Sequence, residues 1–176
     1  MRKPRIIVDG ASYHVVARAN RGEFIFQTYR VKQMFVEIIQ RARQRFAFVI
    51  ENFCIMNNHV HLMIRPAPGE SLSRLMQWIL SVFAQKFNRT FGYKGHVWHD
   101  RFKSKVIETL RQFEATFSYV ARNPQKAGIV ERESDYEFSG VHALMRGRYS
   151  VIDPPGPLVP LLFPEYARIA LASQVR

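Results

Sequence analysis

The chain of 176 residues contains a single cysteine, Cys54. One thiol can form neither an internal disulfide nor a zinc site built from several cysteines, so a disulfide-rich secreted scaffold and a zinc finger are both excluded. Long apolar runs are missing as well, because none approaches the ~20 residues that span a bilayer. The first residues also lack the apolar segment and cleavage site of a signal peptide. We therefore expect a cytoplasmic protein that has no membrane partner.

Acidic residues are scarce: 14 Asp and Glu face 26 Lys and Arg, which gives a net charge of +12. Such an excess predicts a polyanionic partner, with nucleic acid favoured over an acidic membrane surface or a merely solubilising charge. The basic residues are spread along the chain and form no detached tail. The binding surface must therefore be part of the fold, and a hydrophobic content of 47% is sufficient to build its core.

The spacing of apolar residues predicts strands that alternate with helices over residues 1–150. The predicted strands are 12–18, 47–56, 59–65 and 103–109. The predicted helices are 31–42, with Thr28 as its cap, 71–88, with Ser71 as its cap, 110–123, ended by Pro124, and 139–146. Residues 90–102 mix aromatics, cations and glycines without a clear period and are predicted to form a loop.

This order of elements is that of a split βαβ, ferredoxin-like fold, an α+β architecture. It predicts an antiparallel sheet with the first two helices packed on one face, followed by extra C-terminal helices. We assign residues 1–150 to this domain. Residues 151–176 hold five of the nine prolines and are predicted to form an extended tail with a short helix at about 165–173.

Two histidines form the sharpest pattern in the sequence, His59-Val60-His61. Alternate residues of a strand share a face, so these imidazoles should project the same way about 7 Å apart and could share one metal ion. Asn57 and Asn58 tolerate the positive φ angles of a tight turn, and a two-residue turn there would place Cys54 on the histidine face. A thiolate ligand is one interpretation of Cys54; a small buried hydrophobe is the favoured one.

Tyr119 and Asn123 form a second pattern, one helical turn apart. Tyr119 lies off the apolar stripe of its predicted helix, so it is not simply part of the core. It could place a nucleophile beside a metal-ligating amide, although an exposed or interfacial tyrosine explains the same position. Phenols are weak nucleophiles at neutral pH unless a nearby cation or metal helps them to lose their proton.

Four segments together resemble the single-tyrosine transposases of the HUH class, and most closely the REP-associated tyrosine transposases. They occur in the family's order and span about residues 10–145. The segments are Tyr13-His14-Val15-Val16-Ala17-Arg18-Ala19-Asn20-Arg21-Gly22, Met56-Asn57-Asn58-His59-Val60-His61-Leu62, Arg101-Phe102-Lys103-Ser104, and the stretch from Tyr119 through Asn123-Pro124 to Val130.

The resemblance implies a metal-dependent endonuclease and strand transferase that cleaves single-stranded DNA near a hairpin. It assigns His59, His61 and Asn123 as ligands of Mg²⁺ or Mn²⁺. It assigns Tyr119 as the nucleophile that forms a 5′-phosphotyrosine. The implied partner is single-stranded DNA, with hairpin-forming repeats as the expected target, and the implied protein is a monomer or homodimer.

Charged and aromatic residues within and beside these motifs are the predicted DNA contacts. Trp98 and Phe102 are candidates for base stacking. The predicted contacts of cations with DNA are Arg18, Arg21, Arg101, Lys103, Lys105 and Arg122. The sequence departs from the family pattern at Asn57, where the family often has proline, and at Trp98-His99-Asp100, which could supply a further ligand or base or could contact DNA from a loop.

A non-catalytic module is the competing hypothesis, since RNA-recognition domains also combine a ferredoxin-like sheet with positive charge. However, the aromatic-rich strand motif of those domains is not found here. A transposase descendant kept only as a DNA-binding regulator is a further alternative. The presence of all four predicted catalytic residues argues against it.

Overall fold

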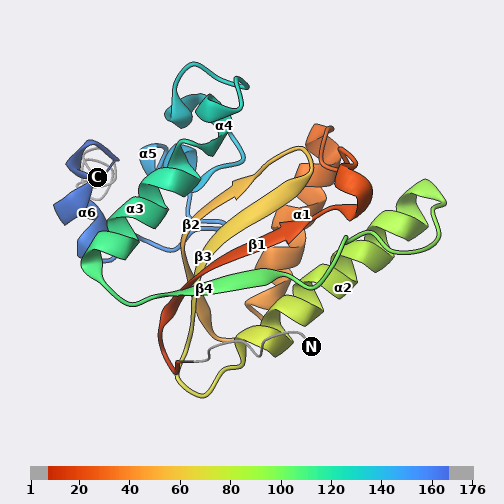
Figure 1. Cartoon of the computed structure of the whole chain (residues 1–176), viewed down its shortest axis with the longest axis horizontal. Coiled ribbons are helices and arrows are strands. Elements are labelled where there is room, and N and C mark those ends of the chain that lie inside the picture. Colours follow the sequence, from red (N-terminus) through yellow and green to blue (C-terminus); the bar gives the residue numbers. More distant parts are fainter. Residues whose placement is uncertain (1–7, 167–176) are drawn as a thin grey trace.

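A computed structural model describes residues 8–166 of the chain. Its centre is a four-stranded antiparallel sheet with the strand order β2-β3-β1-β4 (Figure 1). The strands are β1 (Ser12–Arg18), β2 (Phe48–Ile55), β3 (His59–Pro66) and β4 (Lys103–Ile107). This is the ferredoxin-like sheet expected from the sequence. The observed strands differ from the predicted ones by two residues or fewer at either end.

Two long helices, α1 (Tyr29–Ala42) and α2 (Leu72–Phe91), cover one face of the sheet (Figure 1). That face is apolar because Tyr13, Val15 and Ala17 of β1 are buried while the residues between them are not. Both predicted caps are present: the Thr28 hydroxyl accepts a hydrogen bond from the backbone N–H of Val31, and the Ser71 hydroxyl accepts one from Arg74.

Helix α3 (Leu110–Ala121) packs against β2 and β3 on the opposite face (Figure 1). A bulge in β2 buries Asn52, whose side-chain amide donates a hydrogen bond of 3.2 Å to the Phe117 carbonyl of α3. Gly140, the first residue of α5 (Gly140–Met145), lies directly on the Asn52 side chain. The placement of α3 was not predicted from the sequence, and it sets the position of Tyr119.

The helix expected to end at Pro124 is interrupted instead. Helix α3 stops at Ala121, and a single turn, α4 (Asn123–Lys126), begins beside Pro124. Proline is tolerated there because the first residues of a helix have no intrahelical acceptor for their N–H groups. Asn123 therefore begins the turn that follows the helix carrying Tyr119.

The predicted hairpin at Asn57-Asn58 is confirmed, since the Met56 N–H donates to the His59 carbonyl at 2.8 Å and Cys54 pairs with His61. The expected positive φ angles are wrong, because Arg21 is the only residue other than glycine with a positive φ between residues 8 and 166. The turn is held from outside instead: its two carbonyls accept hydrogen bonds from the N–H groups of Phe26 and Ala19.

The start of the proline-rich segment packs on the domain. Asp153 accepts hydrogen bonds from the Arg43 guanidinium and from the Ile50 N–H, and Phe163 stacks on Phe117 with ring centroids 4.5 Å apart. The sequence predicted an extended segment here, but residues Leu158–Leu162 form a short helix, α6. Most of the helix predicted at 165–173 lies outside the described residues. Two 3-10 turns, η1 (Asn20–Gly22) and η2 (Glu133–Asp135), complete the fold.

None of the helices between residues 8 and 166 combines the length and apolarity that crossing a membrane requires.

Candidate active site

Five polar side chains from four elements meet on the face of the sheet that α3 covers in part. They are His14 of β1, His59 and His61 of β3, Tyr119 of α3 and Asn123 of α4. The ring centroids of His59 and His61 are 4.8 Å apart, and that of Tyr119 is 5.4 Å from that of His61. The structure therefore brings the predicted nucleophile and all three predicted metal ligands together.

His61 lies at the centre of this group, with only 2% of its surface exposed. Its Nδ1 is 2.9 Å from Nε2 of His14, and its Nε2 is 3.4 Å from the side-chain nitrogen of Asn123. His14 and His61 lie diagonally across neighbouring strands, where side chains of this length can touch. His61 is thus held by one partner at each ring nitrogen.

His59 stands at the first residue of β3 and is half-buried. Its Nδ1 is 2.7 Å from the side-chain oxygen of Asn58. Asn58 is fixed in turn, because its amide nitrogen lies 3.4 Å from the Gly22 carbonyl. The hairpin turn therefore positions His59 as well as connecting two strands.

The pKa values of all three imidazoles lie below the ordinary histidine value. Burial is the main cause at His61, with the neighbouring His59, His14 and Arg18 adding to it, and it lowers the pKa to about 3. Burial also lowers the pKa of His14 and of His59, helped by Lys105 and by Arg18 respectively. The imidazoles are therefore neutral at physiological pH, as metal ligation requires.

Tyr119 is 44% exposed although it contacts the histidines. Its ring meets the edges of the His14 and His61 rings, and the Lys126 ammonium lies 5.7 Å from its ring centroid. The phenol is therefore open to a substrate on one side and has a cation close by.

The donor set fits a divalent cation. The imidazoles of His59 and His61 and the amide oxygen of Asn123 would hold it. The Asn123 amide would first have to turn its oxygen toward His61. Further coordination positions would then remain open for a phosphate oxygen. Between residues 8 and 166 no three His, Cys, Asp or Glu side chains are grouped as a metal site, so a third protein ligand would have to be of another kind, such as the Asn123 amide. Cys54 is fully buried and burial raises its pKa, in agreement with the favoured interpretation as a small hydrophobe.

Cations line the open side of the same face. Lys103 and Lys105 of β4 pair with Val16 and His14 of β1, and directly paired residues point to the same face of a sheet. Arg18 pairs with His59 in the same way. All three cations are exposed. They form a basic strip, Lys105-Lys103-Arg18, beside the histidines.

The other predicted cationic DNA contacts are also exposed. Arg21 lies in the turn η1 after β1, and Arg122 lies between Tyr119 and Asn123 at the end of α3. Arg101 lies two residues before β4, and its backbone N–H donates a hydrogen bond to the Asp100 carboxylate. Arg18, Arg21 and Arg122 lie on segments that border the five-residue group, whereas Arg101 borders a separate cleft.

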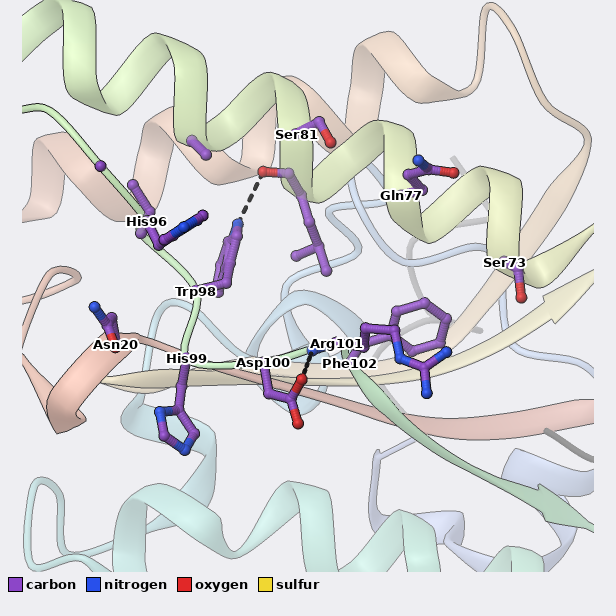
Figure 2. A pocket seen from close by; sticks show the side chains of 14 residues that line it. Asn20, Ser73, Gln77, Ser81, His96, Trp98, His99, Asp100, Arg101 and Phe102 are labelled. Carbon is purple, nitrogen blue, oxygen red and sulfur yellow. Dashed lines mark hydrogen bonds between the residues drawn. The ribbon is translucent and has the colours of Figure 1, made fainter. Parts of the chain in front are cut away.

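That cleft has a volume of about 670 Å³ and lies between α2 and residues 95–102 (Figure 2). Trp98 points toward α2, where its indole N–H donates to the Leu80 carbonyl at 2.8 Å, whereas His99 and Asp100 point away from α2. Trp98 also packs on Phe83, and Phe102 is only 7% exposed. This burial argues against Phe102 as a stacking platform and leaves only part of the Trp98 ring accessible.

Sequence reasoning did not single out His14, Asn58 or Lys126. All three belong to the motif segments, but only strand pairing shows that His14 reaches His61, and only the structure shows that the Lys126 ammonium lies over the Tyr119 ring. His99 and Asp100, considered as extra ligands, belong to no metal-binding cluster among the described residues.

Comparison with known families agrees with this geometry. A family model described as "Transposase IS200 like" matches residues 7–123, which is well over half of the chain. The chain belongs to this family. The residues matched by the family model include His59, His61, Tyr119 and Asn123.

Two relatives of this transposase-family chain are informative. A REP-associated tyrosine transposase of Escherichia coli (strain K12) is 25% identical over 147 residues, covering 82% of this chain and 85% of that protein. A solved structure described as the REP-associated tyrosine transposase bound to a REP hairpin has a TM-score of 0.71 at 23% identity, covering 89% of this chain and 92% of that one. The family resemblance and the fold inferred from the sequence are both confirmed.

Proposed function

We propose that this protein is a transposase that cleaves and rejoins single-stranded DNA near a hairpin, with Tyr119 as its nucleophile and a divalent cation as its cofactor. The observation that carries the proposal is the meeting of Tyr119, His59, His61 and Asn123 on one face of the sheet. These residues come from strands and helices distant in the sequence, and their side chains leave the phenol exposed.

Tyr119 would attack the phosphorus of a phosphodiester. Its phenol oxygen forms a new bond to phosphorus while the bond to the 3′-oxygen breaks; the phenol loses its proton and the departing 3′-oxygen gains one. The products are a 5′-phosphotyrosine and a free 3′-hydroxyl. Because the phosphodiester energy is kept in the covalent bond, a second 3′-hydroxyl can reverse the step and join strands without ATP.

His59, His61 and Asn123 would hold Mg²⁺ or Mn²⁺ beside Tyr119. When bound, the ion supplies electrostatic stabilisation of the charge that develops on the phosphate oxygens. Imidazole nitrogens are softer ligands than the oxygens that Mg²⁺ prefers, so we expect Mn²⁺ to support higher activity than Mg²⁺ at equal concentration.

A hairpin-forming DNA strand is the proposed substrate. Two observations support it: the related solved structure is described as bound to a REP hairpin, and the basic strip runs beside the histidines in this chain. The strip matches the phosphates of a strand that enters the site. The same sheet face carries histidines and lysines rather than the exposed aromatics of an RNA-recognition module, which favours the enzyme over the non-catalytic alternative.

The test is covalent capture. The protein is incubated with Mn²⁺ and a 5′- or 3′-labelled single strand that contains a hairpin, and a denaturing gel is examined for a protein–DNA adduct. Digestion of the adduct and mass spectrometry should place the nucleotide on Tyr119. Attachment at any other residue would overturn the assignment of the nucleophile.

Three variants separate the roles of these residues. Tyr119→Phe removes one hydroxyl from an exposed ring and should abolish both the covalent adduct and the nicked product, while leaving the melting temperature and DNA binding unchanged.

His59→Ala should abolish cleavage but keep DNA binding, because the proposed phosphate contacts are made by other residues. Asn123→Ala should be milder, since it removes one ligand of three. Undiminished cleavage by Tyr119→Phe would leave at best an activated water as the nucleophile.

A further inference from the structure

Both histidines of the HxH strand have their Nδ1 atoms occupied by a neighbouring side chain. The Nδ1 of His59 lies 2.7 Å from the Asn58 side-chain oxygen, and the Nδ1 of His61 lies 2.9 Å from Nε2 of His14. An amide oxygen can only accept a hydrogen bond. His59 must therefore carry its proton on Nδ1, which leaves a lone pair on Nε2.

The contact between His14 and His61 joins two imidazole nitrogens, so only one of them carries the hydrogen. If His61 donates from Nδ1, its Nε2 has a lone pair directed at the position next to Asn123. If His14 donates, His61 carries a hydrogen on Nε2 and cannot use that atom as a ligand. The direction of this hydrogen bond therefore decides whether His61 can bind a cation.

We propose that Asn58 and His14 are positioning residues, which hold His59 and His61 in the Nδ1–H tautomer and present both Nε2 atoms to the cation. The inference rests on the proposed metal site. Each positioning residue would accept a hydrogen bond from its histidine and would act on the cation through that histidine. Outer partners of this kind typically change metal affinity by about 10–100-fold when they are removed.

The surrounding structure fixes both partners. His14 is half-buried and its ring lies over that of His61, with an angle of 18° between the ring planes and 5.2 Å between centroids. Strands β1 and β3 are adjacent in the sheet, so this pair is held by backbone pairing. Asn58 is held through its amide nitrogen on Gly22. The geometry is therefore built into the fold before any ion is present.

The first experiment measures the tautomers directly. Long-range ¹H–¹⁵N spectra of the metal-free, ¹⁵N-labelled protein distinguish a protonated Nδ1 from a protonated Nε2 in each histidine. We expect the Nδ1–H tautomer at His59 and His61 in the wild type. His14→Phe keeps the ring that packs against Tyr119 but removes the acceptor, so His61 should become a mixture of tautomers.

The second experiment measures Mn²⁺ affinity by electron paramagnetic resonance, without DNA. His14→Phe and Asn58→Ala should each weaken binding by about 10-fold or more. His14→Gln and Asn58→Asp restore an accepting oxygen and should recover most of the affinity. The control is His142→Phe, which removes a histidine hydrogen bond of 2.8 Å to the Ser134 carbonyl outside the site and should leave Mn²⁺ affinity unchanged.

The outcomes separate this inference from the proposed function. A wild-type protein that binds no Mn²⁺ would remove the metal site itself. A wild type that binds Mn²⁺ while His14→Phe binds equally well, with the His61 tautomer unchanged, would overturn the positioning role alone. Affinity lost in His14→Phe and not recovered in His14→Gln would show that an accepting oxygen at this position is not sufficient, and this contradicts the hydrogen-bond assignment.

Discussion

Arg21 adopts a left-handed backbone conformation, with φ 52° and ψ 15°, in the exposed turn that follows β1. This conformation costs a residue other than glycine about 1 kcal/mol. Among residues 8–166 its guanidinium has no hydrogen-bond or ion-pair partner, although the turn lies against the hairpin that carries His59. We therefore predict that the Arg21 side chain contacts DNA.

Arg21→Gly tests that role because it relieves the strain. The variant should be as stable as the wild type or more stable by up to about 1 kcal/mol, yet bind single-stranded DNA more weakly and with a salt dependence reduced by about one phosphate contact. Chemical denaturation and a binding titration at several salt concentrations measure both effects. Arg74→Gln, on α2 across the sheet, removes the same charge and serves as the control. Equal affinities for Arg21→Gly and wild type would exclude Arg21 as a DNA contact.

His61 makes the stability of the metal-free protein depend on pH. Burial, helped by the neighbouring His59, His14 and Arg18, lowers its pKa from 6.5 to about 3, so the unfolded chain binds more protons than the folded one between these pH values. Stability should therefore fall as the pH falls below about 6.5, by about 2 kcal/mol at pH 5 compared with pH 7.5. Urea titrations in EDTA at both pH values measure the difference. His61→Gln should show a smaller difference, and an unaltered pH dependence in that variant would contradict the assignment.

At the scale of elements, the position of α3 depends on a contact between β2 and α5. Asn52 is buried in the bulge of β2 and reaches the Phe117 carbonyl of α3, while Gly140 packs against its side-chain oxygen. A methyl group at Gly140 would collide with that oxygen and would lie 3.0 Å from the backbone nitrogen of Phe53. The missing side chain is thus a condition for docking the helix that carries Tyr119.

Gly140→Ala should therefore destabilise the protein by about 1–3 kcal/mol, as overpacking of a core commonly does. Differential scanning calorimetry should show a melting temperature several degrees lower. Gly156→Ala is the matched control, because a Cβ there meets open space and φ is not in the left-handed range; its stability should equal the wild type or exceed it slightly. If both variants melt at the same temperature, the packing argument is wrong.

At the scale of the whole molecule, the +12 charge should dominate DNA affinity. Binding of a hairpin-containing single strand should weaken steeply as salt rises, because each phosphate contact releases condensed counterions. A single strand or hairpin should bind more tightly than a plain duplex of equal length, since the proposed nucleophile Tyr119 would have to reach a phosphate beside unpaired bases. Fluorescence anisotropy from 50 to 300 mM NaCl measures both effects. Salt-insensitive binding, or a preference for duplex, would contradict this picture.

The sequence by itself determined the order of strands and helices, their caps and the family. Apolar spacing along a single element is a local signal, and the HxH pattern places two imidazoles on one face of any strand. The spacing of apolar residues also indicated that Tyr119 lies off the apolar stripe of its helix, which its 44% exposure confirms. Two local predictions were wrong. Pro124 lies in a new helical turn instead of simply ending the helix. Asn57 and Asn58 form their turn without positive φ angles, and their carbonyls accept hydrogen bonds from the N–H groups of Phe26 and Ala19.

Only the tertiary structure decided which residues meet. The diagonal contact of His14 with His61 depends on the register between β1 and β3, and the approach of Tyr119 depends on which face of the sheet α3 covers. Neither is encoded in a single segment, because register and docking are selected by the combined burial of several elements. The same packing placed Phe102 and most of Trp98 inside the protein, where composition alone indicated an exposed aromatic loop.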